Sequence, residues 1–346
     1  MLLARVPAGG EAPRVLDALA GCGIRSLRYA LEGGAAAIWA NDADAARRPL
    51  LTTNLERVGA PQDVRITSLD ARRLLAEALV KGERFDLVDL DAFGCPSALI
   101  APALEVLAHR GVLYLTGSDG RSPTGHDRPA AVRRLGAAAR VHPASWEIAL
   151  RLQLGVVARC AWMQGHGLEP LLSFSEGRTF RTAVRLRRRP AAGEERELGL
   201  VAHCHRCGDQ QVQSLLRLGR WRGCGCGGSL AVSGPLWIGA LQDPPTLAAM
   251  AAQASGTAAR IAPASLRLLE RLGADPGTPP RCWPTAEIGR RLGTGPPPLA
   301  ALVAALQAAG HPSRASGIMA GQLRSAAPWP RILATARGLA LPTAAR

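Results

Sequence analysis

An acidic and aromatic stretch near position 90 carries the residue types most suited to chemistry. Asp89-Leu90-Asp91-Ala92-Phe93-Gly94 follows an apolar run and combines a carboxylate, a small residue and an aromatic ring. Asp91 and a nearby backbone carbonyl can accept both hydrogens of a flat amine, and Phe93 can stack on a base lifted from its own stack. In a plainer interpretation, Asp91 caps a helix and Phe93 fills a core. We favour the amine pocket and predict that Asp91 and Phe93 are catalytic residues.

A second set of polar residues stands where a nucleotide-like cofactor would bind. Asp17 precedes the turn Gly21-Cys22-Gly23, while Asp42 and Asp70-Ala71 end the next two apolar runs. Glycines let the backbone approach a ligand closely, and Asp42, 19 residues after Gly23, suits a ribose diol. Asp70, followed by a small residue, can accept from an adenine amino group. These acids can equally cap the helices that follow them.

Two arginines belong to the helix expected after the glycine turn. Arg25 or Arg28 can meet a carboxylate such as that of methionine, although either can equally be a surface arginine. With such a cofactor bound, Asp91 would aim the lone pair of an amine at the sulfonium methyl group. Orientation does most of the work in this kind of in-line displacement. The two sets of residues therefore predict methyl transfer from S-adenosylmethionine.

Half of the eight cysteines crowd into a short stretch with metal-ligand spacing. Cys204-His205-Arg206-Cys207 is followed, 16 residues later, by Cys224-Gly225-Cys226. Structural zinc takes four thiolate or imidazole ligands on two tight turns, and four protein ligands leave no open position for catalysis. His203 or His205 can replace one thiolate, and the cysteines can also be reduced remnants without metal. We predict a structural zinc ion held by Cys204, Cys207, Cys224 and Cys226.

Alternating strand-like and helix-like segments must position these residues. Apolar runs that read as strands cover residues 14–19, 36–40, 64–67, 85–90 and 111–116, with helices expected over 24–31 and 43–58. A long amphipathic helix within 143–166 and two strands at 168–174 and 179–186 follow. This alternation implies a parallel sheet covered on both faces, and ligands bind at the carboxyl ends of such strands.

Charge is distributed unevenly along the chain. The net charge is +15, but residues 1–109 have a balance of −2 and the remainder +17. Lys81 is the only lysine, which suggests a GC-rich genome, but that bias does not explain the scarcity of acids in the second part. The positive balance favours binding of a polyanion by the second part of the chain. Four arginines there surround the cysteines: Arg206, Arg217, Arg220 and Arg222. Without a secretory signal or a long apolar run, we expect a cytoplasmic protein with no membrane contact.

The stretch around Asp91 resembles the Asp-Pro-Phe/Tyr-Gly signature of the tRNA (guanine-N2)-dimethyltransferases that modify guanine 26. Further blocks resemble the same family in the same order: residues 15–20, 23–30, 40–42, 70–71, 142–151, 169–174, 234–239 and 310–316. The chain departs from the family at Ala92, where the signature has proline. It also departs at Gly317-Ile318 and Leu323-Arg324-Ser325, where the family has Thr-His and a Lys-Thr pair.

The resemblance implies an α/β protein with a class I, Rossmann-like methyltransferase sheet. A small zinc-binding module and a mainly helical C-terminal α+β domain would follow, with boundaries at 1–190, 198–235 and 236–346. It implies cofactor contacts from Arg25 or Arg28, Asp42, Asp70 and Ala71, to which the strand-end argument adds Asp17. The expected reaction methylates the exocyclic N2 of guanine in tRNA, with no obligate protein partner. An amino-methyltransferase acting on another RNA or on DNA, and a non-catalytic tRNA-binding relative, stay open as alternatives.

Overall fold

The computed structural model describes residues 2–5, 12–56, 58, 63–219, 222–255 and 261–339. Contacts divide the chain into two units, each built from three separate stretches. The first unit contains Met1–Asp119, Val156–Ala192 and Asp243–Glu270, and the second unit contains Gly120–Gly155, Gly193–Gln242 and Arg271–Arg346. The sequence predicted three consecutive domains. The two units found from contacts interleave along the chain, so they do not test those boundaries, which stay a prediction.

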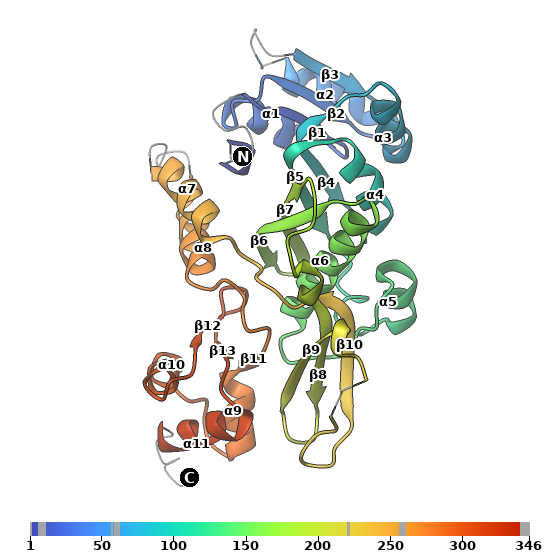
Figure 1. Ribbon diagram of the computed structural model, residues 1–346. Helices are drawn as coiled ribbons and strands as arrows, with labels where there is room; N and C mark the ends of the chain where they lie inside the picture. Colours follow the sequence, from blue (N-terminus) through green and yellow to red (C-terminus); the bar gives the residue numbers. More distant parts are fainter. Residues whose placement is uncertain are drawn as a thin grey trace. The chain divides into compact units, whose positions relative to one another are not determined.

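A sheet of seven strands forms the centre of the first unit (Figure 1). Its order is β3-β2-β1-β4-β5-β7-β6. Strands β1 to β5 pair in parallel, and β7 runs antiparallel to both of its neighbours. The strands are β1 (Arg14–Asp17), β2 (Ala37–Asn41), β3 (Asp63–Thr67), β4 (Phe85–Ala92), β5 (Leu107–Gly117), β6 (Gly167–Glu176) and β7 (Thr179–Arg187). This arrangement confirms the α/β class and the Rossmann-like methyltransferase sheet.

Helices connect the strands because each apolar strand must be covered on both faces. Leu16 of β1 and Leu87 and Leu90 of β4 have no exposed side-chain surface. Helix α1 packs against α2, and α3 packs against α4. The helices of this unit are η1 (Leu2–Arg5), α1 (Ile24–Leu31), η2 (Ala45–Arg47), α2 (Arg48–Leu55), α3 (Ala71–Val80), α4 (Ser97–Glu105) and α7 (Pro244–Ser255).

One helix boundary differs from the sequence prediction. A single helix was expected over 43–58, but a 3-10 turn, η2, precedes α2. Asp44 accepts a hydrogen bond from the amide of Ala46 and so caps η2, while Pro49 occupies the first turn of α2. Proline has no amide hydrogen to donate and is favoured in the first turn of a helix, which agrees with the beginning of α2 there.

The second unit is built on two antiparallel three-stranded sheets, with orders β10-β8-β9 and β11-β13-β12. Their strands are β8 (Leu198–Cys204), β9 (Gln210–Ser214), β10 (Leu230–Trp237), β11 (Cys282–Pro284), β12 (Ser313–Ala315) and β13 (Gln322–Ser325). An apolar core containing Trp283, Leu302, Leu323 and Ile332 lies beneath three helices, which confirms a helical C-terminal region. Helices of this unit are α5 (Arg128–Leu135), η3 (Glu194–Glu197), η4 (Leu215–Arg217), α9 (Thr285–Leu292), α10 (Leu299–Ala308) and α11 (Trp329–Leu339).

Two helices contribute residues to both units: α6 (Ser145–Met163) and α8 (Pro263–Gly273). Among the described residues, no helix combines the length and apolar character that a membrane crossing requires.

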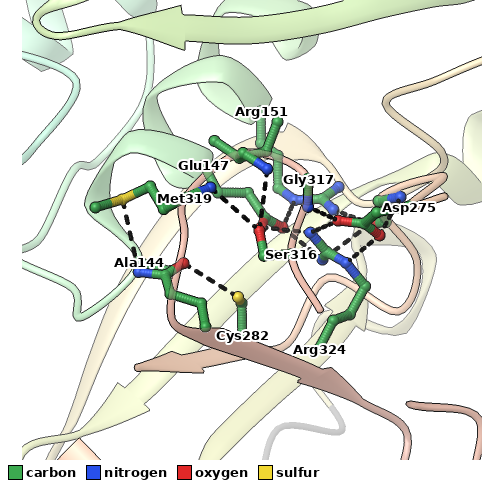
Figure 2. A network of polar contacts seen from close by, with 12 residues as sticks. Ala144, Glu147, Arg151, Asp275, Cys282, Ser316, Gly317, Met319 and Arg324 are labelled. Atoms are coloured by element: carbon green, nitrogen blue, oxygen red, sulfur yellow. Dashed lines mark hydrogen bonds and ion pairs between the residues drawn. The ribbon is translucent and has the colours of Figure 1, made fainter. Parts of the chain in front are cut away.

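A fully buried ionic network joins distant segments of the second unit (Figure 2). Arg324 of β13 donates to both oxygens of Glu147, at 2.8 and 2.6 Å, and to both oxygens of Asp275, at 2.7 and 3.0 Å. Arg151 donates to Glu147 at 2.8 Å and to the carbonyl of Gly239 at 2.9 Å. Although burial alone raises the pKa of Glu147, the charges of Arg324 and Arg151 lower it to about 2. The network therefore ties the start of α6 to β13 with its charges neutralised.

Candidate active site

The carboxyl ends of three neighbouring strands are tied together by one buried side chain, that of Asn41. Its amide nitrogen donates to the carbonyls of Ala18 and Leu69, at 3.1 and 2.9 Å. Its amide oxygen accepts from the hydroxyl of Thr67 and the amide of Leu69, at 2.8 and 2.9 Å. Asn41 thus fixes the ends of β1, β2 and β3 at the edge where a ligand of a parallel sheet binds.

Asp17 ends β1 and has no exposed surface. Its Oδ2 accepts a 2.6 Å hydrogen bond from the hydroxyl of Ser26, while its Oδ1 has no hydrogen-bond partner among the described residues. Burial, reinforced by the neighbouring charge of Asp89, raises the pKa of Asp17 to about 7. A buried acceptor without a partner is costly unless a ligand or water supplies a donor.

Asp42 holds the glycine turn that follows β1. Its two oxygens accept from the amides of Gly21 and Asp44, at 2.9 and 3.0 Å. Gly23 favours glycine because its φ of 79° lies in the left-handed region, and a Cβ there would also lie 2.4 Å from a methyl carbon of Leu51. Asp42 therefore lies beside the turn with oxygen lone pairs to spare for a further donor, and its contact with a ribose stays a prediction.

Asp70 and Ala71 begin α3 at the end of the loop after β3. Asp70 is exposed, and its Oδ1 caps the helix by accepting from the amides of Arg72 and Arg73, at 2.9 and 3.4 Å. Ala71 is buried in the first turn. One oxygen of Asp70 therefore caps α3, which is the alternative role considered for the acids at the strand ends.

The two candidate arginines of α1 have different partners. Arg25 forms ion pairs with Asp89 at 2.8 Å and with Asp91 at 3.0 Å. Arg28 instead pairs with Glu32 at 2.8 Å on an exposed face of the helix. The structure therefore brings Arg25, and not Arg28, to the acidic end of β4.

Asp91 and Phe93 lie just beyond the buried part of β4. The side chain of Asp91 is 38% exposed, and Phe93 is 98% exposed. The plainer interpretation is wrong for both residues, because the residue at the N-cap of α4 is Pro96 and an exposed ring fills no core. The amide of Gly94 donates to the hydroxyl of Ser118 at 2.8 Å, which anchors the loop to the end of β5.

Asp89 and Tyr29 were missed by the sequence analysis. Asp89 is fully buried and accepts a 2.7 Å hydrogen bond from the hydroxyl of Tyr29. Burial raises its pKa, against the opposing effects of the Arg25 charge and the Tyr29 hydrogen bond. Side chains two residues apart on a strand share one face, so the spacing of Asp89 and Asp91 was the signal available.

Comparisons with known proteins agree with this geometry. The model of the N2,N2-dimethylguanosine tRNA methyltransferase family matches residues 7–337. The chain belongs to this family.

Individual relatives match over most of their length. The tRNA (guanine(26)-N(2))-dimethyltransferase of Methanocorpusculum labreanum is 30% identical, over 92% of this chain and 82% of its own. That of Pyrococcus horikoshii is 27% identical, over 91% and 84%. The solved structure of Trm1 from P. horikoshii with S-adenosyl-L-methionine has a TM-score of 0.82 and 25% identity, covering 96% of this chain and 90% of that one.

In this member of the family, the four predicted zinc ligands come together. The sulfur atoms of Cys204, Cys207, Cys224 and Cys226 all lie within 4.8 Å of one another. Neighbouring sulfurs are 3.4 to 3.5 Å apart, close to the edge of about 3.8 Å of a tetrahedron with zinc–sulfur bonds of about 2.3 Å. The donor set therefore fits zinc without His203 or His205. Arg220, expected beside this cluster, lies outside the described residues.

Proposed function

We propose that this chain transfers a methyl group from S-adenosylmethionine to the exocyclic N2 of a guanine in tRNA, at position 26 as the names of its relatives state. The observation that carries the proposal is the arrangement at the end of β4. A partly exposed carboxylate, Asp91, is held by Arg25 beside the exposed ring of Phe93. A base that leaves its stack needs both a stacking face and an acceptor for its amino group.

The strand-end residues fit the cofactor. The unpartnered Oδ1 of Asp17 suits a donor such as the ammonium group of the methionine part. Asp42 supports the ribose hydroxyls, and Asp70 with Ala71 supports the adenine. Arg25 uses its terminal nitrogens for Asp89 and Asp91, and its remaining N–H donors, that of Nε among them, can reach a carboxylate. When bound, S-adenosylmethionine supplies an electrophilic methyl group, which is the chemistry that the protein itself lacks.

Asp91 orients the nucleophile. Its carboxylate accepts hydrogens of the guanine amino group, which directs the nitrogen lone pair out of the ring plane and toward the cofactor. As the nitrogen–carbon bond forms, the bond between that carbon and the sulfonium sulfur would break and leave a neutral thioether. The methylated nitrogen would then release a proton, for which Asp91 is the acceptor at hand. The ring of Phe93 stacks on the face of the base. Orientation of this kind can contribute several orders of magnitude to a rate.

Three further assignments complete the proposal. The four cysteines hold a structural zinc ion, since their set leaves no open coordination position. The basic second part of the chain, with its balance of +17 after residue 109, binds tRNA. A cytoplasmic location is supported by the eight cysteines, none of which forms a disulfide in the structure, because thiols stay reduced there.

The test is a methylation assay with a tRNA transcript that carries guanine at position 26. Nucleoside mass spectrometry should detect N2-methylguanosine, N2,N2-dimethylguanosine or both, and a transcript with adenine at position 26 should gain neither. Methylation of the adenine-26 transcript to the same extent would contradict the proposed position. Tight tRNA binding without any affinity for S-adenosylmethionine in calorimetry would favour the non-catalytic alternative.

A further inference from the structure

A basic groove of about 1100 Å³ lies within the second unit, which holds none of the candidate active-site residues. Its lining comes from β9, from η4 and from the start of α11. We call it the arginine groove after its four basic residues: Arg196, Arg217, Arg222 and Arg281. Pockets for small molecules reach about 1000 Å³, so the size suits a segment of an extended polymer.

Among the described residues, four arginines and one acidic residue, Asp209, line the arginine groove. Arg196, Arg217 and Arg222 are exposed, and the described residues offer none of these three guanidinium groups a hydrogen bond or an ion pair. Like charges gathered in this way repel one another, and a polyanion removes the repulsion. Guanidinium groups also match phosphate oxygens through two parallel hydrogen bonds.

Hydrogen bonds between distant segments make the groove rigid. The side chain of Gln210 on β9 donates to the carbonyl of Cys282 and accepts from its amide, at 2.7 and 3.0 Å. The indole of Trp329 donates to the carbonyl of Cys207 at 2.7 Å, and that of Trp283 donates to Gly208 at 2.9 Å. Trp329 and Trp283 are therefore both bonded to the loop that joins β8 to β9. A groove fixed in this way loses little conformational entropy when it binds.

Among its described lining residues, the groove offers phosphate contacts and no aromatic stacking platform. Trp329 is only 4% exposed and stacks on Trp283, with ring centroids 5.3 Å apart and planes at 13°. Its ring cannot therefore take a base on its face. Leu216, which is 64% exposed, is an apolar lining residue that can contact a ribose. This composition favours the backbone of a nucleic acid, which carries charge in every nucleotide and no sequence information.

We propose that the arginine groove binds the ribose–phosphate backbone of the substrate tRNA, at nucleotides other than the one that is methylated. This inference rests on the proposed function, because it takes tRNA as the substrate. Binding of this kind is independent of sequence and weakens as the salt concentration rises. The logarithm of the binding constant falls with the logarithm of the salt concentration, and each phosphate contact adds about 0.7 to 0.9 to the steepness of that slope. The groove thus holds the body of the tRNA while the reading of guanine belongs to Asp91 and Phe93.

The experiment uses the full chain and an unmodified tRNA transcript in filter binding across a salt series. The double variant Arg217→Gln/Arg222→Gln should weaken tRNA binding about tenfold or more and flatten the salt slope by roughly 1.5. Calorimetric affinity for S-adenosylmethionine should not change. The matched control is Arg337→Gln, which removes an exposed positive charge of α11 about 12 Å along the helix from Trp329. It should leave both the affinity and the slope close to those of the natural protein.

The outcomes separate this inference from the proposed function. If the natural protein neither binds nor methylates tRNA, the proposed function fails, and the groove assignment falls with it. If it does both, but the double variant binds tRNA with the affinity and slope of Arg337→Gln, the groove assignment alone is overturned. A poly-glutamate peptide that displaces tRNA at equal charge concentration would also overturn it, in favour of an acidic protein partner.

Discussion

Arg25 and Asp91 form an ion pair of 3.0 Å at the carboxyl end of β4. The same guanidinium lies 2.8 Å from Asp89, which faces the same side of the strand two residues earlier. Arg25 is thereby fixed by a buried partner while it holds a partly exposed one. The pair explains how Asp91 can be oriented without the proline that the family signature has in place of Ala92, because a side-chain contact supplies the rigidity.

Replacing Asp91 should separate catalysis from cofactor binding. In Asp91→Ala, Arg25 keeps Asp89 as a partner, so the cofactor site should survive. We expect kcat to fall by about two orders of magnitude or more, because transition-state positioning is lost, while the Kd for S-adenosylmethionine barely changes. Single-turnover methylation and calorimetry measure the two quantities. Near-normal turnover would remove Asp91 from the catalytic residues.

Two variants of Asp70 should separate its capping role from cofactor binding. Asp70→Ala removes the cap of α3 and should cost about 1 kcal/mol of stability, whereas Asp70→Ser keeps a capping oxygen. Both lose the carboxylate, so both should bind S-adenosylmethionine more weakly, by about tenfold or more. Asp42→Asn should do the same, and tRNA affinity should hold in all three. Unchanged calorimetric affinity in the Asp42 and Asp70 variants would exclude these acids from the cofactor site.

The purified protein should contain zinc, and the stability of the second unit should depend on it. We expect about one zinc ion per chain. Cys207→Ser should lose it together with thermal stability, because Trp329 and Trp283 bond to carbonyls of the same loop. Cys160→Ser, outside the cluster, is the matched control and should keep the metal. Elemental analysis that finds no zinc after expression with adequate zinc would reject the site.

Asp17 should make the stability of the protein depend on pH. Its pKa is raised to about 7 in the folded chain, from an ordinary value of 3.8, chiefly by burial. The folded state therefore holds a proton that the unfolded state has released, and stability is lost as pH rises from about 4 to about 7. Asp17→Asn imitates the protonated form. The melting temperature of this variant minus that of the natural protein should therefore increase from pH 5 to pH 8. A constant difference across this range would contradict the assignment.

The parts of the fold that follow from local pattern could be predicted from the sequence. The strand from 85 to 90 is apolar except for two acids, and it is observed within β4. The four cysteines meet because tight turns confine each pair, so spacing alone identified them. Arg28 also had a local signal, since Glu32 lies four residues later on the same helix face, and it was overlooked.

Contacts between distant segments could not be predicted in this way. Gln210 and Cys282 are 72 residues apart in the chain, and no periodicity links them. The interleaved units depend on such contacts, because stretches from three parts of the chain combine in each unit. Arg324 is a further example. It lies where the chain departs from the family's C-terminal motif, and no local pattern predicts that its side chain is fully buried in an ionic network.

The buried network around Arg324 gives the largest stability effect that we expect (Figure 2). Glu147→Gln leaves two buried guanidinium groups, those of Arg151 and Arg324, with Asp275 as the remaining carboxylate of the network. Breaking a buried pair in this way costs about 3 to 5 kcal/mol, because an uncompensated charge stays buried. Glu32→Gln is the matched control, since its pair with Arg28 is exposed, and such pairs contribute about 1 kcal/mol or less.

Low pH should remove the stability that the ionised side chain of Glu147 supplies. Because its pKa is lowered to about 2 from an ordinary value of 4.5, the stability that it supplies is fully present above about pH 4.5 and is lost as pH falls toward 2. The difference in unfolding free energy between the natural protein and Glu147→Gln should therefore be large at pH 7 and shrink through this acid range. Urea unfolding at a series of pH values measures it. A cost at pH 7 no greater than that of Glu32→Gln would show that the network does not hold the second unit together.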